Sequence, residues 1–259
     1  MAGGAADDLL GPDDPVPFGL FNATGRSSFL LIGDHAGSAI PKALGDLGLA
    51  ATDRARHIAV DIGTYGLGRT LATLLDAPFL HQVYSRLVID CNRDMDHPTA
   101  IPTVSDGSRV EGNEALDVAD RARRIAAIHT PYHAAIAATI AARQAAGRET
   151  ILLSLHSFTP VMDGIARPWD VGVLHWDGRT DFALALLEAL KQEADLTVGD
   201  NQPYQMDATD YTVPLHAFAQ SLPYAEIEVR QDLIDGLEGQ TVWAGRLHHV
   251  AEAARRRLI

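Results

Sequence analysis

Two histidines in this sequence follow short apolar runs. His35 comes after the apolar run in LLIGDHAG, and His156 comes at the end of the run in LLSLHS. Such runs predict buried strands, and a histidine at a strand end is not required for folding. A neutral imidazole is a common zinc ligand, and a catalytic zinc site needs three protein ligands and an open position for water. We therefore expect both histidines to bind one metal ion; the alternative for each is a hydrogen-bonded histidine in the core.

Two carboxylates complete this hypothesis. Asp61, near the start of a predicted helix, is the candidate for the third metal ligand. In the segment AEIEVR, the two-residue alternation of a strand places Glu226 and Glu228 on one face. Glu228 is the candidate general base, which would take the proton of a water molecule beside the metal.

The segment SRLVIDCNRD, residues 85–94, places several charges around a four-residue apolar run. Burying that much charge is costly unless it is paired. We expect Arg86 to face a developing oxyanion, and Asn92 with Arg93 to hold a substrate carboxylate. The alternative is an internal network of arginine and aspartate, such as Arg93–Asp90.

Further polar residues are candidates for the walls of the same pocket. Arg167, in a loop after the His156 strand, would supply a second carboxylate contact or else a surface salt bridge. His216 and Tyr211 lie in another loop segment and are candidates for pocket lining. His129 and His133 are four residues apart on one helix face, which favours packing near the pocket over metal binding.

These residues must be positioned by alternating strands and helices. The apolar runs predict strands at residues 28–32, 79–83, 87–90, 151–155, 171–174 and 225–229. Helical spacing predicts helices at residues 62–75, 114–146, 182–194 and 242–258, with Pro131 interrupting the second. The alternation predicts an α/β sandwich with a largely parallel sheet, in which ligands collect at the carboxyl ends of strands. We expect residues 1–27 to form an N-terminal arm and residues 28–259 a single catalytic domain.

Composition excludes several classes of function. The chain has 259 residues and a net charge of 21 − 34 = −13, which argues against nucleic acid as a partner. Its single cysteine, Cys91, permits neither an intramolecular disulfide nor a cysteine-based zinc site. The acidic N-terminus has no signal-peptide pattern, and no run of about 18 apolar residues predicts a membrane span. We expect a cytoplasmic protein that is a monomer or a small homo-oligomer.

The order of the motifs resembles one known family. The motifs are His35-Ala-Gly, the stretch from Arg86 to Arg93, Leu155-His156-Ser157 and Ile227-Glu228-Val229-Arg230. Together with NQPY at 201–204 and RPW at 167–169, they are similar to the N-formylglutamate amidohydrolase family over residues 28–258. The resemblance implies a distant relationship to zinc carboxypeptidases and aspartoacylases. It also implies a phosphorylase/hydrolase-like three-layer α/β/α sandwich with a mostly parallel mixed sheet.

The resemblance assigns roles to several of the residues named above. The zinc histidines of the relatives fall on His35 and His156, and their general base falls on Glu228. Their arginine near the scissile carbonyl looks like Arg86, and their pair that holds the substrate carboxylate looks like Asn92-Arg93.

One position departs from the pattern of the carboxypeptidase relatives. Those relatives place a ligand glutamate three residues after the first histidine, where this chain has Ser38, a poor zinc ligand. We assign the missing carboxylate to Asp61. Asp34, or a site with only two protein ligands, is the alternative.

The resemblance implies zinc-dependent hydrolysis of an N-acyl amino acid, a small anionic substrate. N-formyl-L-glutamate would give formate and glutamate, as in histidine catabolism. One alternative is a zinc carboxypeptidase-like enzyme or an N-acyl-amino-acid deacylase of other specificity. An alternative of another class is a non-catalytic module that binds a small molecule.

Overall fold

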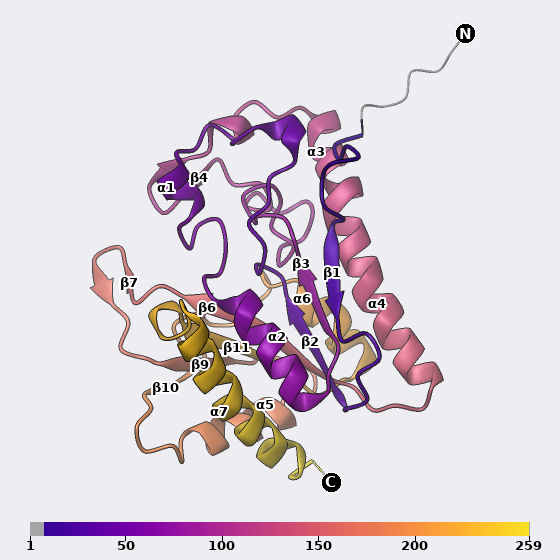
Figure 1. Cartoon of the computed structure of the whole chain (residues 1–259), viewed down its shortest axis with the longest axis vertical. Helices are drawn as coiled ribbons and strands as arrows, with labels where there is room; N and C mark the ends of the chain where they lie inside the picture. The colour runs from indigo at the N-terminus through magenta and orange to yellow at the C-terminus, as the bar shows by residue number, and fades with distance from the viewer. Residues whose placement is uncertain (1–7, 259) are drawn as a thin grey trace.

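A computed structural model describes residues 8–258 of the chain; of the predicted N-terminal arm, residues 1–7 lie outside this range. Seven strands form one central sheet (Figure 1). Their spatial order is β1 (Phe18–Phe21), β3 (Phe79–Gln82), β2 (Phe29–Gly33), β6 (Ile151–Phe158), β11 (Tyr224–Arg230), β9 (Val171–Leu174) and β10 (Val198–Asp200). The sheet is mixed: β3, β2, β6 and β11 are parallel neighbours, β1 runs antiparallel to β3, and β9 runs antiparallel to β11 but parallel to β10.

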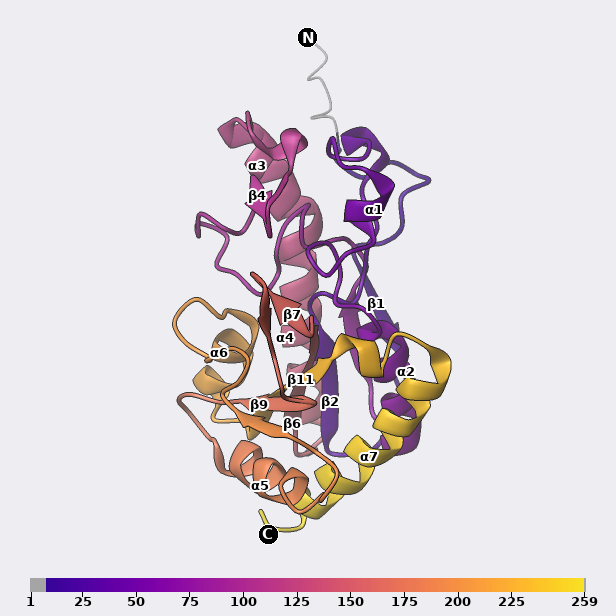
Figure 2. The same cartoon turned by 90° about the vertical axis from the view of Figure 1, so that its left-hand side faces the viewer.

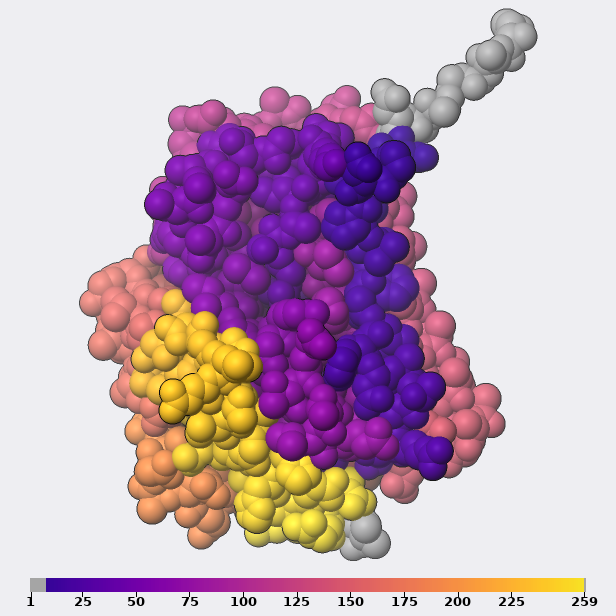
Figure 3. Space-filling view, viewed as in Figure 1, coloured from indigo at the N-terminus to yellow at the C-terminus, as the bar shows by residue number. Residues whose placement is uncertain are grey.

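Helices cover both faces of the sheet, so the molecule has three layers (Figures 1 and 2). On one face lie α2 (Thr64–Leu75), α5 (Asp181–Leu190) and α7 (Leu237–Arg255), whose apolar sides pack on Leu31, Leu153 and Ile227. On the other face lie α4 (Thr130–Ala145) and α6 (Thr212–His216), which pack on Leu30 and Leu152. Figure 3 shows α7, in yellow, against α2 on the outside of the first layer. The predicted α/β sandwich is confirmed.

The predicted strand at residues 87–90 is wrong. Leu87, Val88 and Ile89 are buried in the core but form no strand: residues 86–88 make a turn, with the Val88 amide donating to the Ser85 carbonyl at 2.9 Å. Side chains take the place of a neighbouring strand here: Asn113 donates to the Leu87 carbonyl at 2.9 Å. A short buried apolar run satisfied in this way cannot be told from a strand by its pattern.

The long helix predicted at residues 114–146 is divided into segments. The segments are α3 (Val118–Arg124), a π-helical turn (Ile125–His129) and α4. Pro131 lies in the first turn of α4, directly after the π turn, which accommodates the missing amide hydrogen without ending the helix.

This helical stretch, Val118–Ala145, is the one candidate membrane span within residues 8–258, with a mean hydropathy of 1.2. A core helix satisfies the same criteria of length and composition. Tyr132, Ile136 and Ile140 of the stretch are buried against the sheet, and 33% of its most apolar 18-residue window is buried in all.

Two small hairpins stand outside the central sheet, beyond the carboxyl ends of its parallel strands (Figures 1 and 2). One pairs β4 (Val104–Ser105) with β5 (Ser108–Arg109), and the other pairs β7 (Val161–Met162) with β8 (Ile165–Ala166). Each turn is an Asp-Gly pair with positive φ at both residues, as two-residue hairpin loops of the type I′ class require. A short helix, α1 (Ala51–Arg54), lies at the same end of the molecule.

Candidate functional site

Three adjacent parallel strands carry the predicted chemistry to one edge of the sheet. His35 comes two residues after β2, whereas His156 and Glu228 lie within the last three residues of β6 and β11. Glu228 is the direct cross-strand partner of His156, so their side chains share one face of the sheet. The carboxyl ends of parallel neighbours meet at the same edge, which is the reason that residues 35, 156 and 228 converge.

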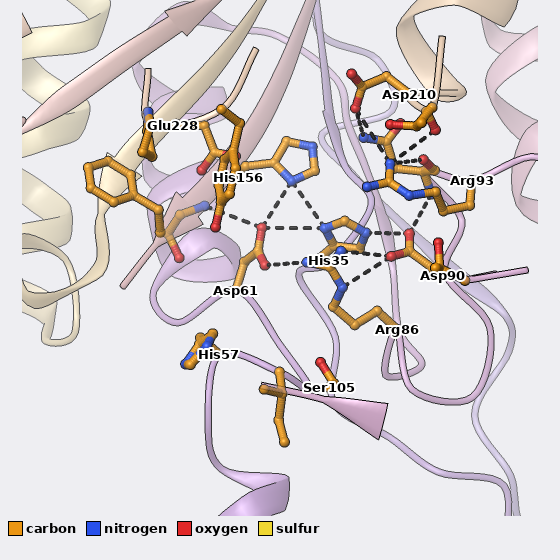
Figure 4. A pocket seen from close by; sticks show the side chains of 18 of the residues that line it. His35, His57, Asp61, Arg86, Asp90, Arg93, Ser105, His156, Asp210 and Glu228 are labelled. Carbon is orange, nitrogen blue, oxygen red and sulfur yellow. Dashed lines mark hydrogen bonds and ion pairs between the residues drawn. The ribbon is translucent and has the colours of Figure 1, made fainter. Parts of the chain in front are cut away.

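His35, Asp61 and His156 form a buried cluster (Figure 4). The Nδ1 atoms of the two histidines are 3.2 Å apart. Asp61 Oδ2 lies 2.9 Å from His156 Nδ1 and 3.5 Å from His35 Nδ1. The Asp61 amide donates to the His35 carbonyl at 2.9 Å, so the backbone before α2 is fixed against the end of β2. Asp61, rather than Asp34, is therefore the carboxylate that meets the two Nδ1 atoms.

The Nε2 atom of each histidine, on the side of the ring away from the cluster, contacts another side chain. His35 Nε2 donates to Asp90 Oδ1 at 2.7 Å. His156 Nε2 lies 3.1 Å from Ser154 Oγ and 3.5 Å from Asp34 Oδ2. Hydrogen bonds of this kind fix the tautomer and the ring orientation of metal-binding histidines. With the proton on Nε2, each ring directs the lone pair of Nδ1 into the cluster.

The spacing of the three inner atoms fits a metal ion. Two nitrogens and one carboxylate oxygen are separated by 2.9, 3.2 and 3.5 Å. Ligands bound tetrahedrally to zinc at about 2.0–2.1 Å are separated by about 3.3 Å along each edge of the tetrahedron. Three lone-pair atoms this close repel one another unless a proton or a metal cation lies between them. The donor set and its spacing therefore suit a divalent metal with a fourth position open to the cavity.

The charges around the cluster also favour a cation. Burial and the charge of Arg86 lower the pKa of His35, but nearby carboxylates, first Asp90, outweigh them and raise it. Burial lowers the pKa of His156, and the surrounding carboxylates, first among them Glu226, raise it well above the ordinary value. The site thus attracts a proton, and a metal ion would satisfy the same negative potential.

Arg86 lines the cavity as part of an internal ion-pair network. Its Nη2 donates to Asp90 Oδ2 at 2.7 Å, and its Nη1 to Asp61 Oδ1 at 3.4 Å. Asp90 thus connects Arg86 with His35. The alternative of an internal network therefore applies to this segment, but through Arg86–Asp90 rather than Arg93–Asp90. The predicted role of Arg86 at the oxyanion stays a prediction.

Glu228 is buried beside the cluster without a protein partner for one oxygen. It is 5% exposed, and its Oε2 has no hydrogen-bond partner within the described part of the chain. Burial raises its pKa to about 7. A carboxylate that titrates near neutral pH can both accept and return a proton, which is the property required of a general base and acid.

A cavity of about 720 Å³ opens over this cluster. Both predicted carboxylate-binding residues line it, but they are held differently. Arg93 Nη1 donates to the carbonyls of Asn92 and Thr209, at 2.8 and 3.1 Å. The Asn92 side chain accepts from the Tyr211 and Thr212 amides, both at 3.0 Å, and donates to Asp210 at 3.2 Å. Asn92 therefore fixes the start of α6, and Arg93 is the better placed of the two to meet a substrate.

Three predicted substrate contacts lie elsewhere. Arg167 is not among the residues that line the cavity; its Nη1 donates to the hydroxyl of Tyr204, which does line it, at 2.9 Å. His216 is buried behind the site, 3.0 Å from His133, and Tyr211 packs on the ring of that same histidine. The expectation that His216 and Tyr211 line the pocket is therefore corrected: His216 stacks on His133 of α4, and Tyr211 meets the same ring edge-on.

Sequence reasoning missed the supporting residues. Asp90 and Ser154, which hold the outer nitrogens of the two histidines, were not assigned this function. The signal for Ser154 was present, since a residue two positions before His156 on a strand shares its face. Asp90 could have been sought as the carboxylate that a metal-binding histidine commonly requires.

The fold and the buried polar edge are typical of an α/β hydrolytic enzyme, and the comparisons with known proteins define the family. A family model described as N-formylglutamate amidohydrolase matches residues 27–235. The chain belongs to this family, as its motifs predicted, and is a hydrolase that acts on an amide. No curated protein matches the sequence.

Two of the similar solved structures share the architecture. The gene product Atu2144 from Agrobacterium tumefaciens is 37% identical, with a TM-score of 0.93 over 96% of this chain and 99% of that one. The N-formylglutamate amidohydrolase from Ralstonia eutropha JMP134 is 23% identical, with a TM-score of 0.72 over 93% of this chain and 99% of that one. An aspartoacylase family protein from Mesorhizobium loti is more distant, at 16% identity and a TM-score of 0.40, with 94% of this chain and 64% of that one covered.

Proposed function

We propose that this protein is a metal-dependent amidohydrolase that removes the N-formyl or N-acyl group of an amino acid. N-formyl-L-glutamate, which would give formate and glutamate, is the first candidate substrate. The observation that carries the proposal is the convergence of His35, Asp61 and His156 beside the buried Glu228.

The residues of the chain have distinct parts in this reaction. A zinc or similar divalent ion held by His35, Asp61 and His156 would supply Lewis acidity toward water and the scissile carbonyl. Glu228 accepts a proton from the attacking water, as the new carbon–oxygen bond forms. It then donates that proton to the amide nitrogen as the carbon–nitrogen bond breaks, releasing the carboxylic acid and the amine. Arg86 adds positive charge near the carbonyl oxygen.

Arg93 is our candidate for the contact with the α-carboxylate of the substrate. It lines the cavity with its side chain 23% exposed, and it lies on the same segment as Arg86. Asn92 positions Arg93 indirectly, since it ties this segment to the start of α6. Arg167 contributes by orienting Tyr204 at the cavity wall.

A second candidate is an N-acyl-amino-acid deacylase of other specificity. It is favoured by one observation: both arginines that line the cavity are already paired with carboxylates, Arg86 with Asp90 and Arg93 with Asp210. A second substrate carboxylate, such as that of glutamate, would have to compete with these pairs.

The test is a substrate panel on the metal-replete full chain. N-formyl and N-acetyl derivatives of glutamate, leucine and lysine are incubated with the protein, and the released formate or acetate is measured. We expect release from at least one N-formyl amino acid and loss of activity after chelation. If bound metal is present and none of the panel is cleaved, the protein is a binding module rather than this enzyme.

We further propose that the protein acts in the cytoplasm on a small anionic N-acyl amino acid, as a monomer or a small homo-oligomer. Its single cysteine is buried, which suits a reducing compartment.

A further inference from the structure

Arg167 and Tyr204 form a polar pair at the wall of the cavity. Tyr204 lines the cavity and is 39% exposed. Arg167, directly after β8, places its guanidinium carbon 4.7 Å from the centre of the Tyr204 ring, and its Nη1 donates to the Tyr204 hydroxyl at 2.9 Å. The Arg167 amide donates to the Pro160 carbonyl at 2.8 Å, which holds this residue at the base of the β7–β8 hairpin. The pair is therefore built from two separate loops.

The Tyr204 hydroxyl has a hydrogen atom left to donate. A phenol hydroxyl can both accept and donate a hydrogen bond, and here Arg167 is the donor to it. The hydroxyl itself donates to no atom among the described residues. Burial and then the charge of Glu228 raise the pKa of Tyr204, so the hydroxyl keeps this hydrogen at neutral pH. A hydroxyl polarised by a guanidinium group is a strong donor for an anion.

The backbone of β9 places Tyr204 near the reacting centre. Gly172 of β9 is the cross-strand partner of Glu228. A Cβ atom on Gly172 would lie 3.6 Å from the Glu228 Cβ, on the same face of the sheet, and would overlap the Gln202 carbonyl. The absence of a side chain at Gly172 thus lets the loop that carries Tyr204 lie against the strand beside Glu228.

Arg167 provides a positive charge that no carboxylate of the described chain neutralises. The two arginines that line the cavity, Arg86 and Arg93, are both paired with carboxylates. Arg167 is partly buried, and its side chain bonds only to the Tyr204 hydroxyl. A partly buried cation without a counter-ion is costly, and a ligand anion would reduce that cost. An N-formyl dicarboxylic amino acid brings two carboxylates, of which Arg93 accounts for one.

We propose that Tyr204 and Arg167 together bind the side-chain carboxylate of the substrate, so that the site selects N-acyl dicarboxylic amino acids. This inference rests on the proposed function for the place of the amide, and it names the specificity residues of the same site. The Tyr204 hydroxyl donates to the carboxylate, and Arg167 polarises that hydroxyl and supplies the opposite charge. Because Tyr204 lies beside Glu228, the short side chain of glutamate is long enough to reach it.

The experiment compares two probes on the metal-replete full chain, N-formyl-L-glutamate and N-formyl-L-glutamine. The glutamine side chain has the shape of glutamate without its charge. We expect kcat/KM for the glutamate probe to exceed that for the glutamine probe by at least about tenfold, the effect of one charge-assisted hydrogen bond. A ratio near one in the wild type would overturn the inference.

Two variants test the pair separately. Y204F removes the hydroxyl, and R167M removes the charge while Tyr204 remains. Each should bring the glutamate-to-glutamine ratio to within about threefold of unity, chiefly through a higher KM for the glutamate probe. Circular dichroism verifies that each variant folds.

The matched control is Y65F, at a tyrosine of α2 that is 42% exposed outside the cavity. The Arg69 guanidinium carbon lies 5.7 Å from the centre of the Tyr65 ring, so the control removes a hydroxyl from a similar pair. Y65F should keep the wild-type ratio. A ratio that neither Y204F nor R167M changes would overturn the inference. An equal fall of kcat on both probes in Y204F would also overturn it, because the hydroxyl would then act on the amide.

A binding measurement separates this inference from the proposed function. L-glutamate and L-glutamine, which share the α-amino and α-carboxyl groups, are titrated calorimetrically into wild type and Y204F. Tighter binding of L-glutamate that depends on Tyr204 supports the inference even if no N-formyl probe is hydrolysed. Equal affinities of the two amino acids in wild type overturn it, even if hydrolysis is observed.

Discussion

The Nδ1 atoms of His35 and His156 face each other at 3.2 Å, and each ring is held through its Nε2 atom by a different part of the chain. The two residues are 121 positions apart in sequence. Their meeting depends on the adjacency of β2 and β6, two parallel strands whose register, with Ile32 opposite Ser154, brings both histidines to the same edge of the sheet. The topology of the sheet thus fixes the position of each candidate metal ligand. A substitution of one ligand should leave the fold intact, so its effect on metal binding can be measured separately.

His156→Ala should remove bound metal. One of three ligand atoms is lost, and the remaining pair holds a divalent ion much more weakly. Elemental analysis after gel filtration measures the stoichiometry, and circular dichroism verifies the fold. His249→Ala, at an exposed histidine of α7, is the control that should keep the metal. An unchanged metal content in His156→Ala would exclude this residue as a ligand.

Glu228→Gln should retain metal and lose activity. The amide has the shape of the carboxyl group but cannot accept the water proton, so kcat should fall by about 10²–10⁴-fold. Steady-state kinetics on the best N-formyl substrate, alongside metal analysis, measures both properties. Normal turnover by this variant would remove Glu228 from the reaction.

Arg124→Met should destabilise the protein, because Arg124 holds the buried turn around Val88. Arg124 is 1% exposed and donates to the Val88 carbonyl and to Asn113 Oδ1, at 2.9 and 2.7 Å. Loss of both bonds leaves two buried acceptors unsatisfied, at a cost of roughly 3 kcal/mol. Urea unfolding measures the change in the free energy of unfolding. Arg123→Met, on the surface beside it, should change that energy by less than about 0.5 kcal/mol, and equal effects would contradict the interpretation.

Acid should destabilise the protein through the buried pair His133 and His216. Burial lowers the pKa of His133 to about 3 and that of His216 to about 4. In the unfolded chain both titrate near 6.5, so below that pH the unfolded state binds more protons. Each residue then removes about 1.4 kcal/mol of stability per pH unit as the pH falls toward its folded pKa.

The comparison that isolates this effect is wild type against His216→Gln, both metal-replete, from pH 4.5 to 8. Metal binding prevents the titration of His35 and His156, whose raised pKa values would act in the opposite direction. We expect the wild-type free energy of unfolding to fall more steeply below pH 6.5 than that of the variant. Parallel curves would show that His216 is not buried in its neutral form.

The strands and the residues at their ends could be predicted from the sequence where the hydrophobic pattern is consistent with only one kind of secondary structure. The strand at Val171–Leu174 was predicted with its observed bounds, and β6 and β11 within three residues. Their apolar runs end in polar residues at the sheet edge, and the same signal identified His156 and Glu228. Asp61 required its position before a helix and the absence of a glutamate at residue 38.

The predictions that were wrong depended on contacts between residues far apart in the sequence. Leu87 to Ile89 is as apolar as a strand, but Asn113 and Arg124 satisfy its backbone from distant positions, which no local pattern reveals. Phe18–Phe21, within the predicted arm, forms the edge strand β1 against β3. The loop polarity of His216 and Tyr211 suggested a pocket, whereas tertiary packing placed both under α4.

The hairpins β4–β5 and β7–β8 contribute Val104, Ser105 and Met162 to the walls of the cavity, yet neither shares a ladder with the seven-stranded sheet. Insertions or replacements in these appendages would leave the ligand geometry intact, because the sheet edge is built independently of them. Changes in these hairpins can therefore alter which molecules enter the cavity without disturbing the residues at the sheet edge. A protein designer could likewise replace the hairpins and keep the same cluster of His35, Asp61 and His156.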